Sequence, residues 1–165
     1  MEKFKALVNE ANKSFEVADH LAFVTYPLLN EVKLLIIIAE NLFITLDKGM
    51  TALLYYDWLY KRIDNVPEGF QRKLDIFRTR TARRYNIPEE HISLIKDIYE
   101  IIQHRKKSPI EFAMKDKFVV ASNNYKLRTV NLSSIKKQIA LAKMFIDKVN
   151  KIKEESDLRF KFKND

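Results

Sequence analysis

A chain of 165 residues, 47% of them hydrophobic, can bury a core of ordinary size, so a single domain is expected. A formal net charge of +8 favours a polyanionic partner, nucleic acid or an acidic membrane, over an acidic protein surface. The absence of cysteine excludes disulfides, cysteine-zinc sites and thiol catalysis, and it fits a reducing compartment.

The first twenty residues mix acidic and apolar side chains and lack the continuous apolar stretch of a signal peptide. The most apolar run, Leu34 to Ala39, is far too short to span a membrane. We therefore expect a cytoplasmic protein with no membrane association. Only two Gly and four Pro interrupt the chain, which favours long helices.

Apolar residues recur at helical spacing from Lys3 to about Tyr26, which predicts an amphipathic helix. Pro27 is expected to stop or kink this helix, and Asn30 is a suitable N-cap for the next one. Because the link between the two is only a few residues long, we expect them to form an antiparallel helical hairpin.

The stretch from Glu31 to Ile63 is the most apolar part of the chain and predicts a long helix. Its apolar residues cover most of the circumference of a helical wheel, so this helix needs partners on at least two sides. We interpret it as the central helix of a bundle. Its polar residues fall on one narrow stripe, which consists of Lys33, Glu40, Asp47, Thr51 and Arg62.

Turn-forming residues at 64–69 separate the central helix from a predicted third helix between about Glu68 and Tyr85. One side of this helix is apolar, whereas the other gathers most of its cations, so it is the most basic element of the chain. Asn86, followed by an acidic residue three positions later, predicts the start of a fourth helix, which ends in a run of cations at 104–107.

From Lys117 to Asn131 the pattern changes to a period of two, which predicts a β-hairpin whose turn is the segment 122–124. Asn131 or Ser133 can cap a last helix that runs to about Ile152. Residues 154–165 form a basic and aromatic tail, for which a short edge strand and disorder remain alternatives. The predicted fold is therefore mainly α: residues 1–153 form one antiparallel bundle of about five helices, with a β-hairpin before the last.

The cations of the third helix and those that end the fourth helix form one basic surface if the two elements pack together. Clustered guanidinium groups bind phosphates through bidentate geometry and counterion release, so this surface is a candidate for nucleic-acid binding. The alternative is a solvated face of a basic protein. The candidate binding residues are Arg72, Lys73, Arg78, Arg80, Arg83, Arg105, Lys106 and Lys107.

The predicted second helix is long, reads Ala-Glu-Asn-Leu at 39–42 and continues through Lys48, and Arg84 and His91 form an Arg-x6-His spacing at a helix junction. In these two features the sequence resembles the HEPN superfamily of small helical bundles. Many members of that family are ribonucleases or partners of nucleotidyltransferases in toxin-antitoxin systems.

The resemblance implies an RNA-binding protein, and with it metal-independent RNA cleavage. In that reaction Arg84 would bind the scissile phosphate, and His91 would act as acid, base or orienting group for attack by a ribose 2′-hydroxyl. The resemblance also implies a homodimer, because the active site of that family commonly forms across two chains. The structural alternative is that His91 only caps a helix or packs in the core.

Neither a metal nor a cofactor is expected. The chain has Glu and His four residues apart at Glu16 and His20 and again at Glu100 and His104, but such neighbours are ordinary surface pairs on helices. The chain also lacks a Gly-rich phosphate loop. The rival functional hypothesis is a non-catalytic protein-protein interaction module, in which the tail or the hairpin adds a strand to a partner.

Overall fold

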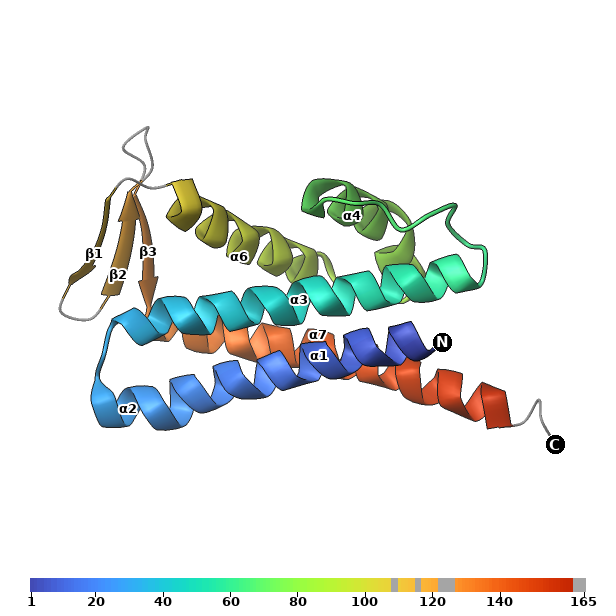
Figure 1. Cartoon of the computed structure of the whole chain (residues 1–165), viewed down its shortest axis with the longest axis horizontal. Helices are drawn as coiled ribbons and strands as arrows, with labels where there is room; N and C mark the ends of the chain where they lie inside the picture. Colours follow the sequence, from blue (N-terminus) through green and yellow to red (C-terminus); the bar gives the residue numbers. More distant parts are fainter. Residues whose placement is uncertain (108–109, 115–116, 122–126, 162–165) are drawn as a thin grey trace.

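The computed structural model describes residues 1–107, 110–114, 117–121 and 127–161. Within these ranges five helical rods and one small antiparallel sheet form a mainly α bundle, which confirms the predicted fold class (Figure 1). In chain order the five rods are residues 2–29, 33–59, 70–84, 89–107 and 132–161, and the first and third rods each contain a π-helical segment. The elements are α1 (Glu2–His20), η1 (Leu21–Thr25), α2 (Tyr26–Leu29), α3 (Lys33–Leu59), α4 (Phe70–Ile76), η2 (Phe77–Thr81), α5 (Ala82–Arg84), α6 (Glu89–Lys107), β1 (Ile110–Met114), β2 (Lys117–Ala121), β3 (Leu127–Asn131) and α7 (Leu132–Lys161).

The central helix α3 packs against α1, α4, α6 and α7, as its nearly continuous apolar circumference predicts (Figure 1). Its polar stripe is satisfied mainly by neighbouring helices: Asp47 pairs with Lys73 of α4, and Glu40 pairs with Arg105 of α6. Burying each large apolar side chain contributes roughly 1.5–3 kcal/mol to folding. The large apolar side chains of α3 that are fully buried are those of Leu35, Ile38, Leu42, Leu46, Met50, Leu53 and Leu54.

The first helical rod does not stop at Pro27 but continues to Leu29, so of the two predicted effects of the proline, a stop or a kink, the stop was wrong. The π-helical segment η1 ends two residues before the proline, and the N–H of Tyr26 bonds back to the carbonyl of Leu21. The π turn replaces the usual bond between residues four apart with one between residues five apart. This change in the backbone hydrogen bonds lies next to Pro27, which has no N–H to donate. The rod ends at Asn30, which has a φ of 52° and acts as a C-cap, so its predicted role as an N-cap was wrong.

Asn86 was also predicted as an N-cap, and it too ends a helix. Its φ is 50°, its N–H bonds to the carbonyl of Arg83, and the N–H of Ile87 bonds to the carbonyl of Ala82. This pair of bonds is a Schellman motif, which an Asn can adopt because it tolerates the left-handed region. Helix α6 begins three residues later, at Glu89.

The predicted hairpin corresponds to β2 and β3, which pair in antiparallel register between Lys117–Asn131 and Ala121–Leu127. The predicted turn at 122–124 lies outside the described residues. A third strand that the sequence did not reveal, β1, pairs with the other edge of β2. The side chain of Asn131 accepts a hydrogen bond from the N–H of Ser134 at 2.8 Å and thereby caps α7.

Helix α7 continues to Lys161, so the predicted helix end near Ile152 was wrong and residues 154–161 are neither strand nor disordered. The extra turns pack along the start of α1. Lys5 and Asp157 form an ion pair of 2.6 Å, and the hydroxyl of the buried Ser156 lies 3.6 Å from the sulfur of Met1. The end of the predicted tail, residues 162–165, lies outside the described ranges.

Gly49 lets α3 and α7 approach closely. A Cβ atom at this position would lie 2.8 Å from the ring of Phe145 on α7. Phe145 is fully buried, and its ring also packs edge-on against Phe77 of η2 and His91 of α6. Four elements therefore meet at one aromatic ring, which has little freedom to move aside.

The first prediction concerns this contact. Gly49→Ala should lower the free energy of unfolding by about 1–2 kcal/mol, because overpacking the core outweighs the gain in helix propensity of about 1 kcal/mol. Urea denaturation measures the change. Combining Gly49→Ala with Phe145→Leu should cost less than the sum of the two single changes. A Gly49→Ala chain that is more stable than the wild type would contradict the packing argument.

Candidate functional site

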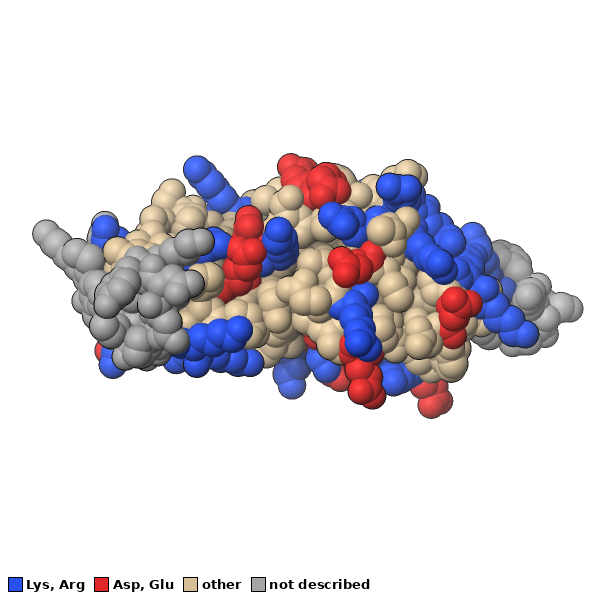
Figure 2. All heavy atoms as spheres, turned by 90° about the horizontal axis from the view of Figure 1, so that it is seen from above, with Lys and Arg blue, Asp and Glu red and all other residues tan. Residues whose placement is uncertain are grey.

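Four arginines of the third rod point to solvent. Leu74, Phe77 and Ala82 occupy the buried side of the rod, because they follow the spacing of its helical turns. The same rod carries Arg72, Arg78, Arg80 and Arg83, which are all exposed, and we call this set the arginine surface. Figure 2 shows that Lys and Arg side chains on the upper face gather toward the end of the molecule at which α7 ends.

The other predicted nucleic-acid residues do not join this surface. Lys73 is mostly buried and bonds Asp47 at 2.5 Å and Thr51 at 3.0 Å, and Arg105 pairs with Glu40. Lys106 and Lys107 are exposed, but they lie at the far end of α6, beside the sheet (Figure 1). The single basic surface that the sequence suggested is therefore divided between two ends of the molecule.

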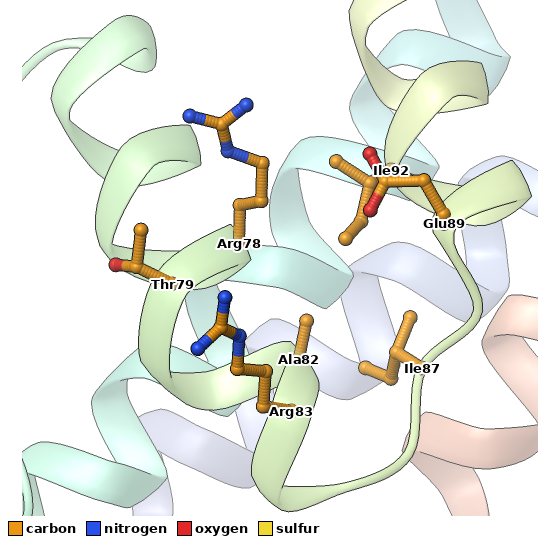
Figure 3. A pocket seen from close by; sticks show the side chains of 7 residues that line it. All are labelled: Arg78, Thr79, Ala82, Arg83, Ile87, Glu89 and Ile92. Carbon is orange, nitrogen blue, oxygen red and sulfur yellow. The ribbon is translucent and has the colours of Figure 1, made fainter.

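A groove separates the third rod from the start of α6 (Figure 3). It consists of one hollow of about 340 Å³ and a neighbouring one of about 230 Å³, which share Arg78, Glu89 and Ile92. In Figure 3 the guanidinium groups of Arg78 and Arg83 lie on one side of the larger hollow, and the Glu89 carboxylate lies across from them. The lining residues of the larger hollow are Arg78, Thr79, Ala82, Arg83, Ile87, Glu89 and Ile92.

This groove offers three kinds of contact. The two guanidinium groups can donate paired hydrogen bonds to phosphate oxygens. The hydroxyl of Thr79 donates its proton to the carbonyl of Asp75 and can accept a further bond, and Glu89 can accept bonds from sugar hydroxyls or base amino groups. Ala82, Ile87 and Ile92 also line the groove, but each is almost fully buried, so the apolar surface that they present to a ligand is small.

Arg84, in contrast to these arginines, binds the carboxylate of Asp57. Asp57 lies near the end of α3 and is fully buried. Its Oδ2 accepts bonds from Arg84 and, at 2.8 Å, from the hydroxyl of Thr81; its Oδ1 accepts a bond from the hydroxyl of Tyr85 at 2.8 Å. Arg62 lies 3.4 Å from Oδ1 and also donates to the Tyr85 hydroxyl at 3.0 Å. We call these five residues the Asp57 network.

Two local features of the backbone build the network. At the end of α3, Lys61 has a φ of 55°, and the N–H of Arg62 bonds to the carbonyl of Asp57, so the chain turns back and returns Arg62 toward the carboxylate. On the third rod, the π-helical η2 ends at Thr81, whose side chain is buried against Asp57. Burial and the hydrogen bond to Asp57 both raise the pKa of Tyr85, so its hydroxyl remains a donor at neutral pH.

His91 lies in the core. Its side chain has no exposed area, packs edge-on against Phe145 with ring centroids 6.1 Å apart, and leaves both ring nitrogens without a described partner. Burial lowers the pKa of His91, so the neutral ring is favoured. Within the described ranges, no hydrogen bond or ring contact joins His91 to Arg84. A general acid or base must reach its substrate, and in this structure His91 has no access to one.

The described residues contain no group of three His, Asp or Glu side chains that could hold a metal ion. Across the same ranges, no helix is both long enough and apolar enough to cross a membrane.

The sequence did not reveal Asp57. It is a single acidic residue in the last two turns of an otherwise apolar and aromatic helical stretch, and a lone charge in such a place requires partners when it is buried. That signal could have identified the residue but not its partners. Arg62, Thr81, Arg84 and Tyr85 meet it only because the turns after α3 and within the third rod bring them together.

The second prediction tests the Asp57 network. Asp57→Asn keeps the shape of the side chain but removes its charge and presents an amide N–H₂ to groups that donate. We expect a loss of about 3 kcal/mol in the free energy of unfolding, measured in urea, since a buried charge pair loses one partner. The matched control is Asp147→Asn, which removes an exposed pair with Lys143 and should cost about 0.5 kcal/mol or less. Equal losses in the two variants would contradict a special role for Asp57.

The third prediction concerns His91 and pH. Unfolded His91 binds a proton more readily than folded His91, because burial lowers the folded pKa. Protonation of His91 therefore leaves the free energy of unfolding unchanged above about pH 6.5. Below that value, the free energy of unfolding decreases as the pH falls, because the unfolded chain binds the proton more tightly. In His91→Leu this decrease should disappear, and stability near pH 7.5 should be unchanged or about 1 kcal/mol higher, since two unpartnered nitrogens are removed.

Urea denaturation at about pH 5.5 and pH 7.5 measures the effect. The exposed His20 provides the matched control, and His20→Gln should follow the wild-type profile. A His91→Leu chain that retains the wild-type loss of stability at low pH would show that His91 is not its source.

No known protein-family model matches this chain. No curated protein and no solved structure is significantly similar to it.

Proposed function

We propose that this protein binds RNA through the arginine surface of the third rod and the groove beside it. The observation that carries the proposal is the concentration of four exposed arginines on one rod, two of which, Arg78 and Arg83, line a groove with an apolar floor. The choice of RNA follows from the resemblance to the HEPN superfamily. It is consistent with the formal net charge of +8.

The pairing of other cations supports this choice of surface. Lys5, Lys48, Lys73 and Arg128 each form an ion pair with a carboxylate on another element of the bundle. For the arginine surface, no ion pair or hydrogen bond to an acidic group occurs within the described residues. Like charges in close proximity repel one another, and a polyanion relieves that repulsion while it releases its own counterions.

The geometry supports binding more strongly than cleavage. Arg84 is held by Asp57, and His91 is enclosed by the core, so these two side chains do not face one RNA together in a single chain. The catalytic role of Arg84 and His91 stays a prediction of the resemblance. RNA binding does not depend on it, because the arginine surface and its groove do not include either residue.

The fourth prediction tests RNA binding. Wild-type protein should bind a fluorescently labelled single-stranded RNA with an affinity that falls steeply as salt increases. Arg78→Gln with Arg83→Gln should weaken binding about tenfold at low salt and reduce the slope of log K against log [salt] by about 1.4, which corresponds to two lost phosphate contacts on a single strand. Fluorescence anisotropy at several salt concentrations measures both quantities.

The matched control removes the same charge from the other end of the molecule. Lys106→Gln with Lys107→Gln should leave the salt slope within error of the wild type, because these residues lie beside the sheet. If both double variants weaken binding equally, RNA contacts the protein through net charge alone. If RNA does not bind, or binds with an affinity that does not depend on salt, the proposal is ruled out. If DNA of the same sequence binds more tightly than the RNA, the ligand of this surface is DNA.

A second candidate function is protein-protein interaction, and one apolar surface favours it. Phe23, Val24, Leu28 and Leu29 are exposed at the end of the first rod, with Leu28 77% and Leu29 60% accessible. Contiguous exposed apolar side chains commonly mark contact sites between proteins. This surface lies at the opposite end of the bundle from the third rod (Figure 1), so the two functions are compatible.

A further inference from the structure

A second pocket lies where the end of α3, the end of the third rod and the last turns of α7 meet. Its volume is about 270 Å³, which is small for a ligand site, since such sites commonly measure about 300–1,000 Å³. It is separate from the groove of Figure 3, with which it shares no lining residue. Its lining residues are Tyr56, Arg62, Arg84, Tyr85, Ile152, Glu155 and Arg159, and we call it the three-arginine pocket.

Two of its guanidinium groups are held in place by hydrogen bonds to the Asp57 network. Arg62 and Arg84 each use Nη1 in their bonds to the Asp57 network, and their side chains remain 30% and 35% exposed. A guanidinium group has five N–H donors, so both retain donors for a ligand. Because Asp57 is fully buried and already accepts several hydrogen bonds, it orients these arginines and does not occupy the pocket.

The third guanidinium group comes from another part of the chain. Arg159 is exposed on the last turns of α7, one helical turn after Glu155. The charges of Arg62, Arg84 and Arg159 exceed those of Asp57 and Glu155 by one, so the site as a whole is cationic. Ile152 and the two tyrosine rings form its apolar walls, which lower the local dielectric constant and strengthen the attraction of an anion.

We propose that the three-arginine pocket binds a phosphate group, either as a free phosphate or small phosphomonoester or as the terminal phosphate of an RNA. The three arginines that line this pocket offer more donors than the two oxygens of a carboxylate can accept, whereas a terminal phosphate presents three oxygens. The small volume admits one such group and excludes the continuous path of a nucleotide chain. This inference does not rest on the proposed function, because it uses none of the residues of the arginine surface.

Titration with inorganic phosphate is the fifth prediction and tests the site without RNA. At constant ionic strength, adjusted with chloride, phosphate should shift the side-chain NMR signals of Arg84 and Arg159 in a saturable manner. Arg159→Gln should weaken binding at least fivefold, and Glu155→Gln should strengthen it severalfold, because it removes a competing negative charge. The matched control is Lys151→Gln, an exposed charge on α7 outside the pocket, which should leave affinity within twofold of the wild type.

A further variant separates binding from folding. Arg84→Lys keeps a positive charge beside Asp57 but loses the planar fork, so the protein should remain folded and bind phosphate more weakly. No saturable shift in the wild-type protein would overturn the proposal. Equal weakening by Arg159→Gln and Lys151→Gln would also overturn it, since binding would then depend on net charge and not on the pocket.

Two forms of one short RNA identify the source of the phosphate. If the 5′-phosphorylated form binds more tightly than the 5′-hydroxyl form, and Arg159→Gln abolishes the difference, the pocket holds an RNA end. If inorganic phosphate binds but the two RNAs do not differ, the ligand is a free phosphate or a small ester. Arg78→Gln with Arg83→Gln should retain phosphate binding, so failure of the RNA-binding proposal and failure of this one give different results.

Discussion

The carboxylate of Asp57 is the constraint on which much of this bundle depends. A charge with no exposed surface is costly unless donors surround it, and here the donors come from the turn after α3 and from the third rod. The two elements that supply these donors are therefore tied to the end of the central helix at a fixed rotation. Once Thr81 and Arg84 face Asp57, the helical geometry directs Arg72, Arg78, Arg80 and Arg83 elsewhere, toward solvent.

Arginines that are close in sequence thus serve different physical roles. Arg84 acts in a partly buried pair, where solvent ions screen the interaction only weakly, whereas Arg83 next to it stands in solvent and is fully subject to screening. Salt should consequently affect ligand binding on this rod much more than the folding of the rod itself. The same segment can hold the bundle together and present a surface that responds to ionic conditions.

Periodicity was sufficient to predict the helical rods and the β2–β3 hairpin, because both patterns are local and repeat many times. The errors arose where one residue type serves two purposes. Asn30 and Asn86 fit an N-cap and a left-handed C-cap equally well, and only the hydrogen bonds of the folded chain decide between them. The alternation of Leu158 and its neighbours with cations suggested a strand or a tail, but packing of α7 on α1 favours a helix there.

For the candidate site, the sequence identified the cationic rod but not which cations are already paired, since Lys73 and Arg105 find their carboxylates on α3. His91 lies at a helix start in the sequence, yet the burial that removes it from solvent depends on Phe145, more than fifty residues later.

The contact between α1 and α7 has a consequence for how the chain reaches this fold. Asn12 and Asn150 lie 138 positions apart in the sequence and exchange two side-chain hydrogen bonds, and Ser156 contacts Met1 at a separation of 155 positions. During synthesis, α1 and α3 can form their hairpin early, but the apolar side of α1 that faces α7 stays uncovered until the last helix has left the ribosome. The nascent bundle therefore spends most of its translation time with an incomplete core, a state in which chaperones protect a chain against aggregation.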